Sequence, residues 1–339
     1  MRPAGSSDSV GLQDVLSVLR INPLSTASTM KKINSSLAAI TAVALWGLAF
    51  PLIQDSLEFF SPIMLGFLRF GVASIMMTVV LLRLYTPREI KSLLSREWRP
   101  IVVLAALYVT IPNIAQNIGL QEGTSSVACV IQSSSPVLTL LFAVALLGEK
   151  LTRAKGIGTL IAMAGTIILV TDGGISLENE SFVSSAIIMV SAVSYGLAWV
   201  SAKRVIERNP PMLVIGLAII IGTLFLALAL PMETELRFDA TPVAVFDLLV
   251  LGTLCAAVSS ILYLSVLKTE EVSRMAFFIY MMPVFASLFA WILRGEMVEV
   301  LTVACGFVIV VGIVIATRGP RQAYSGKSVN IHDWVTRRR

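Results

Sequence analysis

Residues 123–171 read GTSSVACVIQSSSPVLTLLFAVALLGEKLTRAKGIGTLIAMAGTIILVT, and this stretch decides the fold. Residues 124–147 contain no charged side chain and carry Pro136 near their middle. A turn follows at 148–153, with the sequence GEKLTR, and residues 156–171 are apolar again. Apolar runs of about 20 residues span a bilayer, and membrane helices tolerate an internal proline. The stretch therefore predicts two membrane helices joined by a tight, charged turn.

The same pattern returns later in the chain. Eight residues recur 147 positions on: Pro136 as Pro283, Leu141 as Leu288, Phe142 as Phe289, Ala143 as Ala290, Gly148 as Gly295, Glu149 as Glu296, Gly165 as Gly312 and Ile168 as Ile315. Upstream, WGLAF at 46–50 is echoed by YGLAW at 195–199. Because an internal repeat fixes the architecture, we divide the chain into repeats at 34–171 and 182–318, with tails at 1–33 and 319–339.

The composition excludes a soluble globular protein. The mean hydropathy is +0.85, with 56% hydrophobic and 14% charged residues. The net charge of +5 does not indicate nucleic-acid binding, because the basic residues lie in loops that flank apolar runs. Cys129, Cys255 and Cys305 lie within apolar runs without metal-ligand spacing. We therefore expect neither a metal nor a cofactor.

Ten apolar spans are expected, at about 34–54, 62–82, 100–120, 124–147, 154–171, 182–202, 210–231, 243–267, 274–293 and 299–317. All 26 lysines and arginines except Arg69, Arg237 and Arg294 then fall in the tails or in loops on one side. Basic loops stay in the cytoplasm. This predicts a multi-pass protein of the cytoplasmic membrane with both termini inside the cell.

Five spans per repeat is an odd number, so the second repeat must be inverted relative to the first. The predicted fold class is an all-α integral membrane protein of ten transmembrane helices, arranged as two inverted five-helix repeats. Inverted repeats are typical of secondary transporters, whose solute site lies near the bilayer midplane between the repeats.

Several motifs together resemble a known family. They are the Trp46-Gly-x-x-Phe50 start, the segment from Pro62 to Arg69, and Pro136 followed by LLGEKLT and Gly165. They are similar to the EamA-type repeat of the drug/metabolite transporter superfamily. The second copy departs from the pattern, with Ala218 for Arg69 and Cys305 for Gly158. The resemblance implies transport of small organic solutes, such as amino acids or drugs.

Two charged residues stand out within the spans. Arg69 lies about 10 Å from the outer boundary, at about 1.5 Å per helical residue. Such a cation marks either a functional site or a structural contact with helix-end carbonyls. Asp247 either lies inside the eighth span, at a depth that allows pairing with Arg69, or precedes that span and faces water. In the first case Asp247 is a candidate for ion coupling.

Amides cluster in the third and fourth spans. Asn113 and Asn117 share one helix face, Gln116 lies beside them, and Gln132 follows on the next helix. Such amides either join helices or line a cavity. In the second copy, Tyr280 lies one residue past the position equivalent to Gln132. We therefore predict a solute site formed by Asn113, Gln116, Gln132 and Tyr280, with Arg69 as a further contact.

Glu149 and Glu296 occupy equivalent positions in the two turns, at opposite membrane faces. Each either caps the helix that follows it or takes part in gating. Gly158, Ala162 and Gly165 form a stripe of small residues, which predicts a helix contact surface.

The sequence favours a carrier, most simply an exporter, of small organic solutes that acts by alternating access. We expect a small-molecule solute, the lipid bilayer and no nucleic acid as partners, and a monomer or homodimer as the assembly. An intramembrane enzyme is disfavoured because the spans hold no paired carboxylates, and the single histidine, His332, lies in the tail. A membrane sensor or scaffold that does not transport is the remaining alternative.

Overall fold

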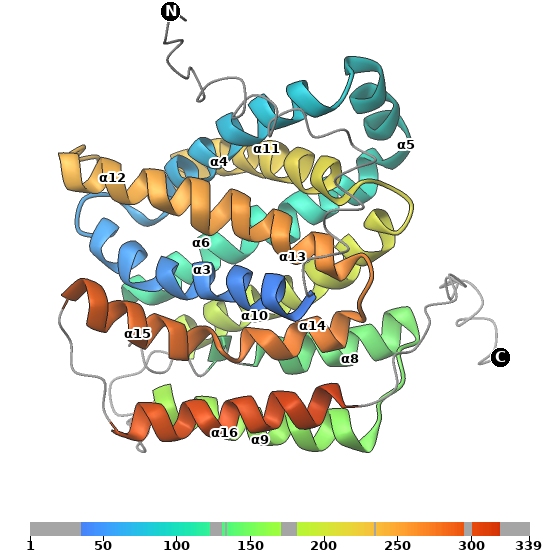
Figure 1. Ribbon diagram of the computed structural model, residues 1–339. Helices are drawn as coiled ribbons and strands as arrows, with labels where there is room; N and C mark the ends of the chain where they lie inside the picture. Colours follow the sequence, from blue (N-terminus) through green and yellow to red (C-terminus); the bar gives the residue numbers. More distant parts are fainter. Residues whose placement is uncertain are drawn as a thin grey trace, which may run out of the picture.

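The computed structural model of the protein describes residues 35–122, 131–132, 134–170, 182–233, 235–294 and 300–318. Over these ranges the chain is helical, and its one β contact is an isolated bridge between Phe60 and Phe238 (Figure 1). Both tails, Cys129 and Glu296 lie outside the described residues.

The helices of the first half are α3 (Ser35–Ser56), α4 (Pro62–Leu84), α5 (Pro87–Ala105), η1 (Ala106–Thr110), α6 (Ile111–Glu122), α8 (Ser135–Leu147) and α9 (Arg153–Val170). Those of the second half are α10 (Phe182–Ile206), α11 (Pro211–Ala229), η2 (Leu230–Met232), α12 (Pro242–Val250), η3 (Leu251–Val258), α13 (Ser259–Leu267), α14 (Val272–Ile279), α15 (Met282–Arg294) and α16 (Val300–Thr317). Within the described ranges, seven helical segments are long and apolar enough to cross a membrane, and Ser135–Leu147 and Val303–Thr317 form shorter apolar helices.

The helix that holds the third predicted span begins before the apolar run. The structure starts this helix at Pro87, where Thr86 and Glu89 form a reciprocal capping box. The apolar span expected at 100–120 lies within α5, η1 and α6, and the amphipathic, charged turns from Pro87 onward precede it. Glu97 has non-helical backbone angles, φ −120° and ψ 20°, three residues before Pro100. Proline removes a helical hydrogen bond and crowds the preceding turn, which explains the kink there.

Two helices widen into π-helical segments near their middle. These are η1 at Ala106–Thr110 and η3 at Leu251–Val258, and the repeat offset places them at corresponding positions of the two halves. Pro112 follows η1 and has no N–H to donate, which favours a wider turn before it. At the end of η1, Thr110 Oγ1 donates a hydrogen bond to the Gly222 carbonyl of α11 at 3.2 Å, which joins the two helices.

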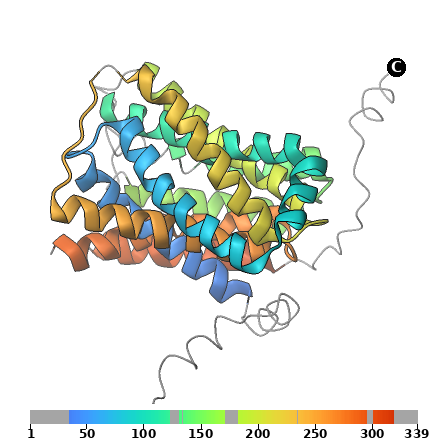
Figure 2. The same cartoon turned by 90° about the horizontal axis from the view of Figure 1, so that it is seen from above.

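The helices α9 and α16 lie together along one edge of the molecule (Figure 1). A Cβ atom at Gly158 would lie 2.4 Å from the Ala316 nitrogen, and one at Gly312 would lie 2.6 Å from the Ala162 nitrogen. Glycine is thus required on both sides of this contact, as the small-residue stripe predicts. At the opposite edge α4 and α11 lie side by side and run obliquely to α12 (Figure 2).

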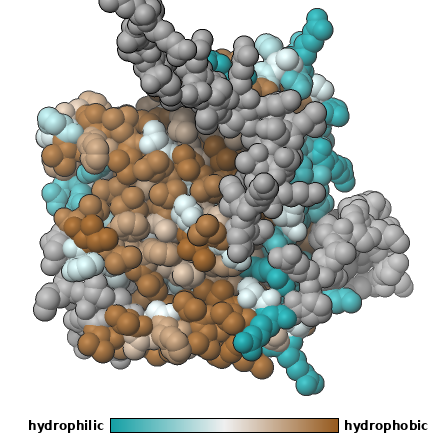
Figure 3. Space-filling view, viewed as in Figure 1, coloured by the Kyte–Doolittle hydropathy of each residue, from teal (hydrophilic) through white to brown (hydrophobic). Residues whose placement is uncertain are grey.

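Apolar side chains cover much of the surface of the helices. Leu228 of α11 is 77% exposed and Phe307 of α16 is 72% exposed. On the face of the molecule drawn in Figure 3, apolar side chains (brown) cover most of the surface, and most hydrophilic ones (teal) lie along the right-hand edge. Soluble monomers rarely expose apolar patches of this extent, whereas lipid-facing helices must. The protein is therefore a multi-pass membrane protein.

Candidate functional site

A cavity of about 480 Å³ opens among α3, α4, α6, α8, α10 and α15. This volume is typical of sites for small organic molecules. Most of its wall is apolar or aromatic. The polar side chains in the wall, tryptophans aside, come from both halves of the chain, and they are Arg69, Tyr108, Gln116, Gln132, Ser135, Thr166, Tyr195, Tyr280 and Ser287.

Aromatic rings form one side of the cavity. Trp46 of α3 and Trp199 of α10 both line it, and their ring centroids are 5.5 Å apart. Tyr263 of α13 packs behind them, with its ring centroid 4.5 Å from that of Trp199. Tyr108 of η1 completes the cluster, and its hydroxyl hydrogen-bonds Ser260 Oγ at 2.6 Å. This cluster offers a rigid apolar surface to the body of a solute.

Several buried polar atoms of the cavity wall have no hydrogen-bond partner in the described structure: Arg69 Nε, Gln132 Oε1, Trp199 Nε1 and Tyr280 OH. An unsatisfied buried polar group costs about 1–3 kcal/mol. Such groups are rare in folded proteins, and where they cluster they call for a ligand or ordered water. Such atoms also occur outside the cavity, at Ser56, Ser191 and Tyr263, but four of them lie in the wall of this one cavity.

The predicted amides separate into two groups. Gln116 and Gln132 line the cavity, as does Tyr280. Asn113 is not among the lining residues; its Nδ2 donates to the Val109 carbonyl at 2.7 Å, and its Cβ lies 4.0 Å from where a Cβ at Gly66 of α4 would be. Asn117 donates across to the Pro62 carbonyl of α4 at 2.8 Å. The structure thus places Asn113 in a helix contact, where the sequence predicted a solute contact.

The two intramembrane charges also lie apart. Arg69 extends from α4 and lines the cavity. Asp247 is 6% exposed in α12, outside the described cavity wall, and forms no ion pair with Arg69. The pairing that the first alternative for Asp247 allowed is therefore not present in this structure.

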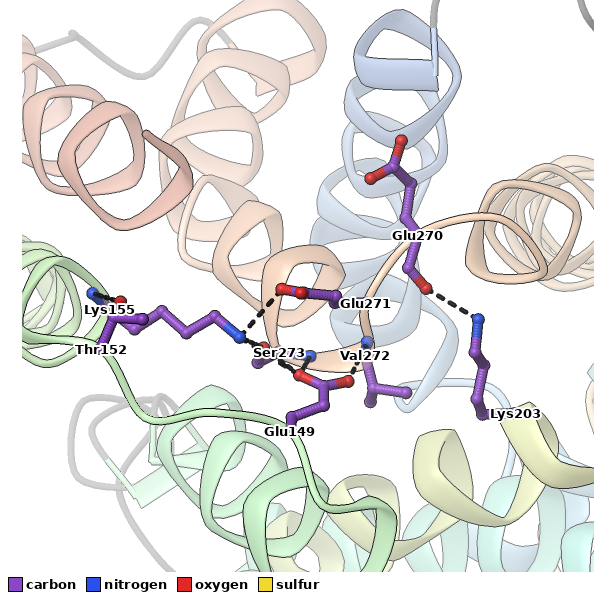
Figure 4. A network of polar contacts seen from close by, with 8 residues as sticks. All are labelled: Glu149, Thr152, Lys155, Lys203, Glu270, Glu271, Val272 and Ser273. Atoms are coloured by element: carbon purple, nitrogen blue, oxygen red, sulfur yellow. Dashed lines mark hydrogen bonds and ion pairs between the residues drawn. The ribbon is translucent and has the colours of Figure 1, made fainter. Parts of the chain in front are cut away.

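A second polar cluster joins the two halves at the end of the bundle that carries the basic loops (Figure 4). Gly148 ends α8 with a φ of 71°, a left-handed conformation that favours glycine, and directs Glu149 toward α14. Glu149 Oε1 accepts from the Val272 nitrogen at 2.7 Å, and Oε2 accepts from the Ser273 nitrogen at 3.3 Å. Glu149 also accepts a hydrogen bond from the Ser273 hydroxyl.

Glu149 thus caps a helix, but not the one that follows it. Thr152 caps α9, by accepting from the Lys155 nitrogen at 3.2 Å. The carboxylate of Glu149 instead neutralises the amino-terminal end of α14, which lies 123 residues later in the chain. The expectation of a local cap was wrong because the left-handed Gly148 turns the chain toward the other half.

Lys155 completes this cluster, which we call the clamp: Glu149, Lys155, Glu271, Val272 and Ser273. Its Nζ lies 3.4 Å from Glu149 Oε2 and 2.9 Å from Glu271 Oε2, and it donates to Ser273 Oγ at 2.7 Å. The side chain of Glu149 is 1% exposed and that of Lys155 is 8% exposed. The clamp is therefore a buried ion cluster between the first half and α14.

Sequence reasoning missed the partners of Glu149. Lys155 was assigned only to the basic loops, and Glu271 lies in a loop between expected spans. Adjacent carboxylates just before a helix, at 270–271, are a signal for a capped helix end. Nothing in the linear sequence connects that signal to a turn more than a hundred residues earlier.

Comparisons with known proteins agree on one class. The EamA-like transporter family matches residues 34–171 and 184–318. An "Uncharacterized transporter" of Archaeoglobus fulgidus is 26% identical over 276 residues, which covers 81% of this chain and 96% of that protein. A "Probable terminal-alkyne amino-acid exporter" of Streptantibioticus cattleyicolor is 23% identical, over 85% of this chain and 95% of that protein.

A solved structure shares the fold. It superposes with a TM-score of 0.73 at 21% identity and covers 84% of this chain and 96% of its own.

Proposed function

Because this chain belongs to the EamA-like transporter family, we propose that it carries small organic solutes across the cell membrane in the direction of export. The observation that carries this proposal is the central cavity, whose wall combines aromatic rings with unpartnered polar atoms. A cavity of this kind suits a solute with an apolar body and a polar group. The similarity to a protein named as an amino-acid exporter supports both the solute class and the direction.

We further propose ten membrane-crossing segments in two inverted repeats. The helices α3, α4, α5 to α6, α8 and α9 would form the first repeat, and α10, α11, α12 to α13, α14 to α15 and α16 the second. The corresponding π-helical segments η1 and η3 support this arrangement. Both termini would then lie in the cytoplasm, because the basic loops share one end of the bundle.

The mechanism that this arrangement supports is alternating access. The clamp joins the turn of the first repeat to α14 of the second, so it closes the end that we assign to the cytoplasm. Opening that end requires the separation of Glu149 from α14, which the lost hydrogen bonds make costly. Solute binding in the cavity would offset part of this cost and link transport to occupancy.

Flux through proteoliposomes tests the proposal directly. Purified protein, reconstituted into vesicles preloaded with a mixture of labelled amino acids and other small organic acids, should release at least one solute faster than protein-free vesicles. The released solute should be chemically unchanged, which distinguishes a carrier from an intramembrane enzyme. Vesicles that release every solute at the protein-free rate would favour the sensor or scaffold alternative.

A further inference from the structure

We propose that the solute is an organic anion whose carboxylate binds Arg69 and whose apolar body packs on the aromatic side of the cavity. This inference rests on the proposed function of the cavity as the solute site. It narrows that function from small organic solutes in general to acids.

Arg69 is the one charged residue among the described residues that line the cavity. It forms no ion pair with any described carboxylate, and its Nε has no hydrogen-bond partner. A guanidinium within a membrane is costly, and such cations normally pair or serve a site. The Arg69 guanidinium lies over the Phe70 ring, 5.3 Å from its centroid, but no described carboxylate neutralises its charge, which is left to what enters the cavity.

Arg69 shares the cavity wall with Tyr108 and Tyr195. The guanidinium presents several donors in a planar fork that matches a carboxylate. Gln116 and Gln132 lie in the same wall and offer further amide donors to the second carboxylate oxygen or to a neighbouring polar group.

The cavity suits a cation less well than an anion, because a cation would find aromatic rings but no carboxylate in the described wall. Among its described lining residues there is no aspartate or glutamate. An amine would therefore lose its hydration shell without gaining an ion pair, and it would also be repelled by Arg69. The wall thus favours solutes that carry a carboxylate over amines that carry none.

Matched pairs of acids and amides test this inference. We would measure the binding of 3-phenylpropionate and 3-phenylpropionamide, and of hexanoate and hexanamide, to the purified full chain by ligand-dependent thermal stabilisation. Each pair has the same body and differs in charge. We expect each acid to bind at least about tenfold more tightly than its amide, and 3-phenylpropylamine to bind more weakly than either.

Variants locate the source of the preference. In Arg69→Gln the ratio of acid to amide affinity should fall to about one, and in Arg69→Lys it should be intermediate, because charge remains but the fork is lost. Arg237→Gln is the matched control, since Arg237 lies outside the cavity and bonds the Leu57 and Glu58 carbonyls. It should keep the wild-type ratio.

The outcomes separate this inference from the proposed function. Equal binding of acids and amides by the wild-type chain, no binding of either acid, or a preference for acids that survives in Arg69→Gln, would overturn the assignment of an anion to Arg69. The comparison of acid and amide binding by the wild-type chain tests the preference for anions even if the variants fold poorly. Flux of neutral or cationic solutes through proteoliposomes would then leave the carrier function standing.

Discussion

The clamp and the central cavity are both polar regions inside an apolar bundle, but they differ in how their polar atoms are partnered. In the clamp, Glu149 accepts three hydrogen bonds and faces the ammonium of Lys155. In the cavity, Gln132, Tyr280 and Arg69 each keep a buried polar atom without a partner. The carboxylate of Glu149 in the clamp is bound by other residues of the chain, whereas these atoms of the cavity wall have no partner in the described structure.

This difference indicates different roles. A fully connected buried network specifies one arrangement of the elements that it joins, and breaking it is costly. Polar atoms without a partner contribute no such specificity. The free-energy cost of their desolvation is offset only when a solute or water occupies the site. Substitutions in the clamp should therefore change the conformation of the protein, while substitutions in the cavity should change its affinity for solute.

The largest expected effect is all-or-none and concerns the side of the membrane that the clamp faces. Ser92 is exposed in α5, at the end of the helix bundle where the clamp also lies. A cysteine at this position should not react with an impermeant thiol reagent applied to intact cells. A cysteine replacing Asp239, exposed at the opposite end, should react fully. Labelling of the Ser92 position from outside would reverse the orientation and place the clamp at the external face.

Glu149→Ala should have the next largest effect. Removal of one partner from a buried charge cluster costs about 3–5 kcal/mol. The variant leaves the ammonium of Lys155 with Glu271 and the Ser273 hydroxyl as partners, and it leaves the end of α14 uncapped. We expect a clear drop in the thermal unfolding midpoint and a fall in transport of at least tenfold.

Glu58→Ala is the control for this change, because Glu58 is an exposed carboxylate at the other end of the bundle. Its midpoint and transport should match the wild type. If Glu149→Ala were as stable and as active as Glu58→Ala, the clamp would not hold the two halves together.

Gln132→Ala tests whether the unpartnered amide of the cavity wall binds the solute. Loss of one hydrogen bond to a solute costs about 1–1.5 kcal/mol, so transport affinity should weaken by roughly tenfold with unchanged thermal stability. Asn113→Ala is the matched amide control, because Asn113 bonds to its own helix outside the cavity wall. It should change affinity by less than about threefold. A reversed order of these two effects, measured by solute dose response in proteoliposomes, would move the site toward Asn113.

The sequence indicated the helices well and the contacts between them poorly. Hydropathy placed α4 and α16 within two residues of their observed ends, because apolar runs report directly on helices surrounded by lipid. It placed the third span at 100, just after the kink at Glu97, and did not detect the amphipathic helical turns that begin at Pro87. Helix type and length are local properties and can therefore be predicted from composition.

The candidate site was only partly predictable for a related reason. Gln116, Gln132, Tyr280 and Arg69 do line one cavity, because polar residues in apolar spans turn away from lipid. Whether such a residue faces a cavity or a neighbouring helix depends on helix rotation, which the sequence does not report, and Asn113 shows the consequence. The partners of Glu149 depend on packing between the two halves and could not be inferred from spacing.

The smallest effect on solute affinity is expected from Asp247→Asn. Asp247 is buried in α12, but it lies outside the described cavity wall and does not pair with Arg69. Its substitution should therefore change solute affinity by less than about twofold.

A buried carboxylate that does not bind the solute, such as Asp247, is suited to carry a proton instead. We expect the wild-type chain to transport faster when a proton gradient is imposed on proteoliposomes, and the Asp247→Asn chain to lose this stimulation while keeping its basal rate. Stimulation that persists in Asp247→Asn would assign coupling to another group, and weaker solute binding in this variant would extend the site toward α12.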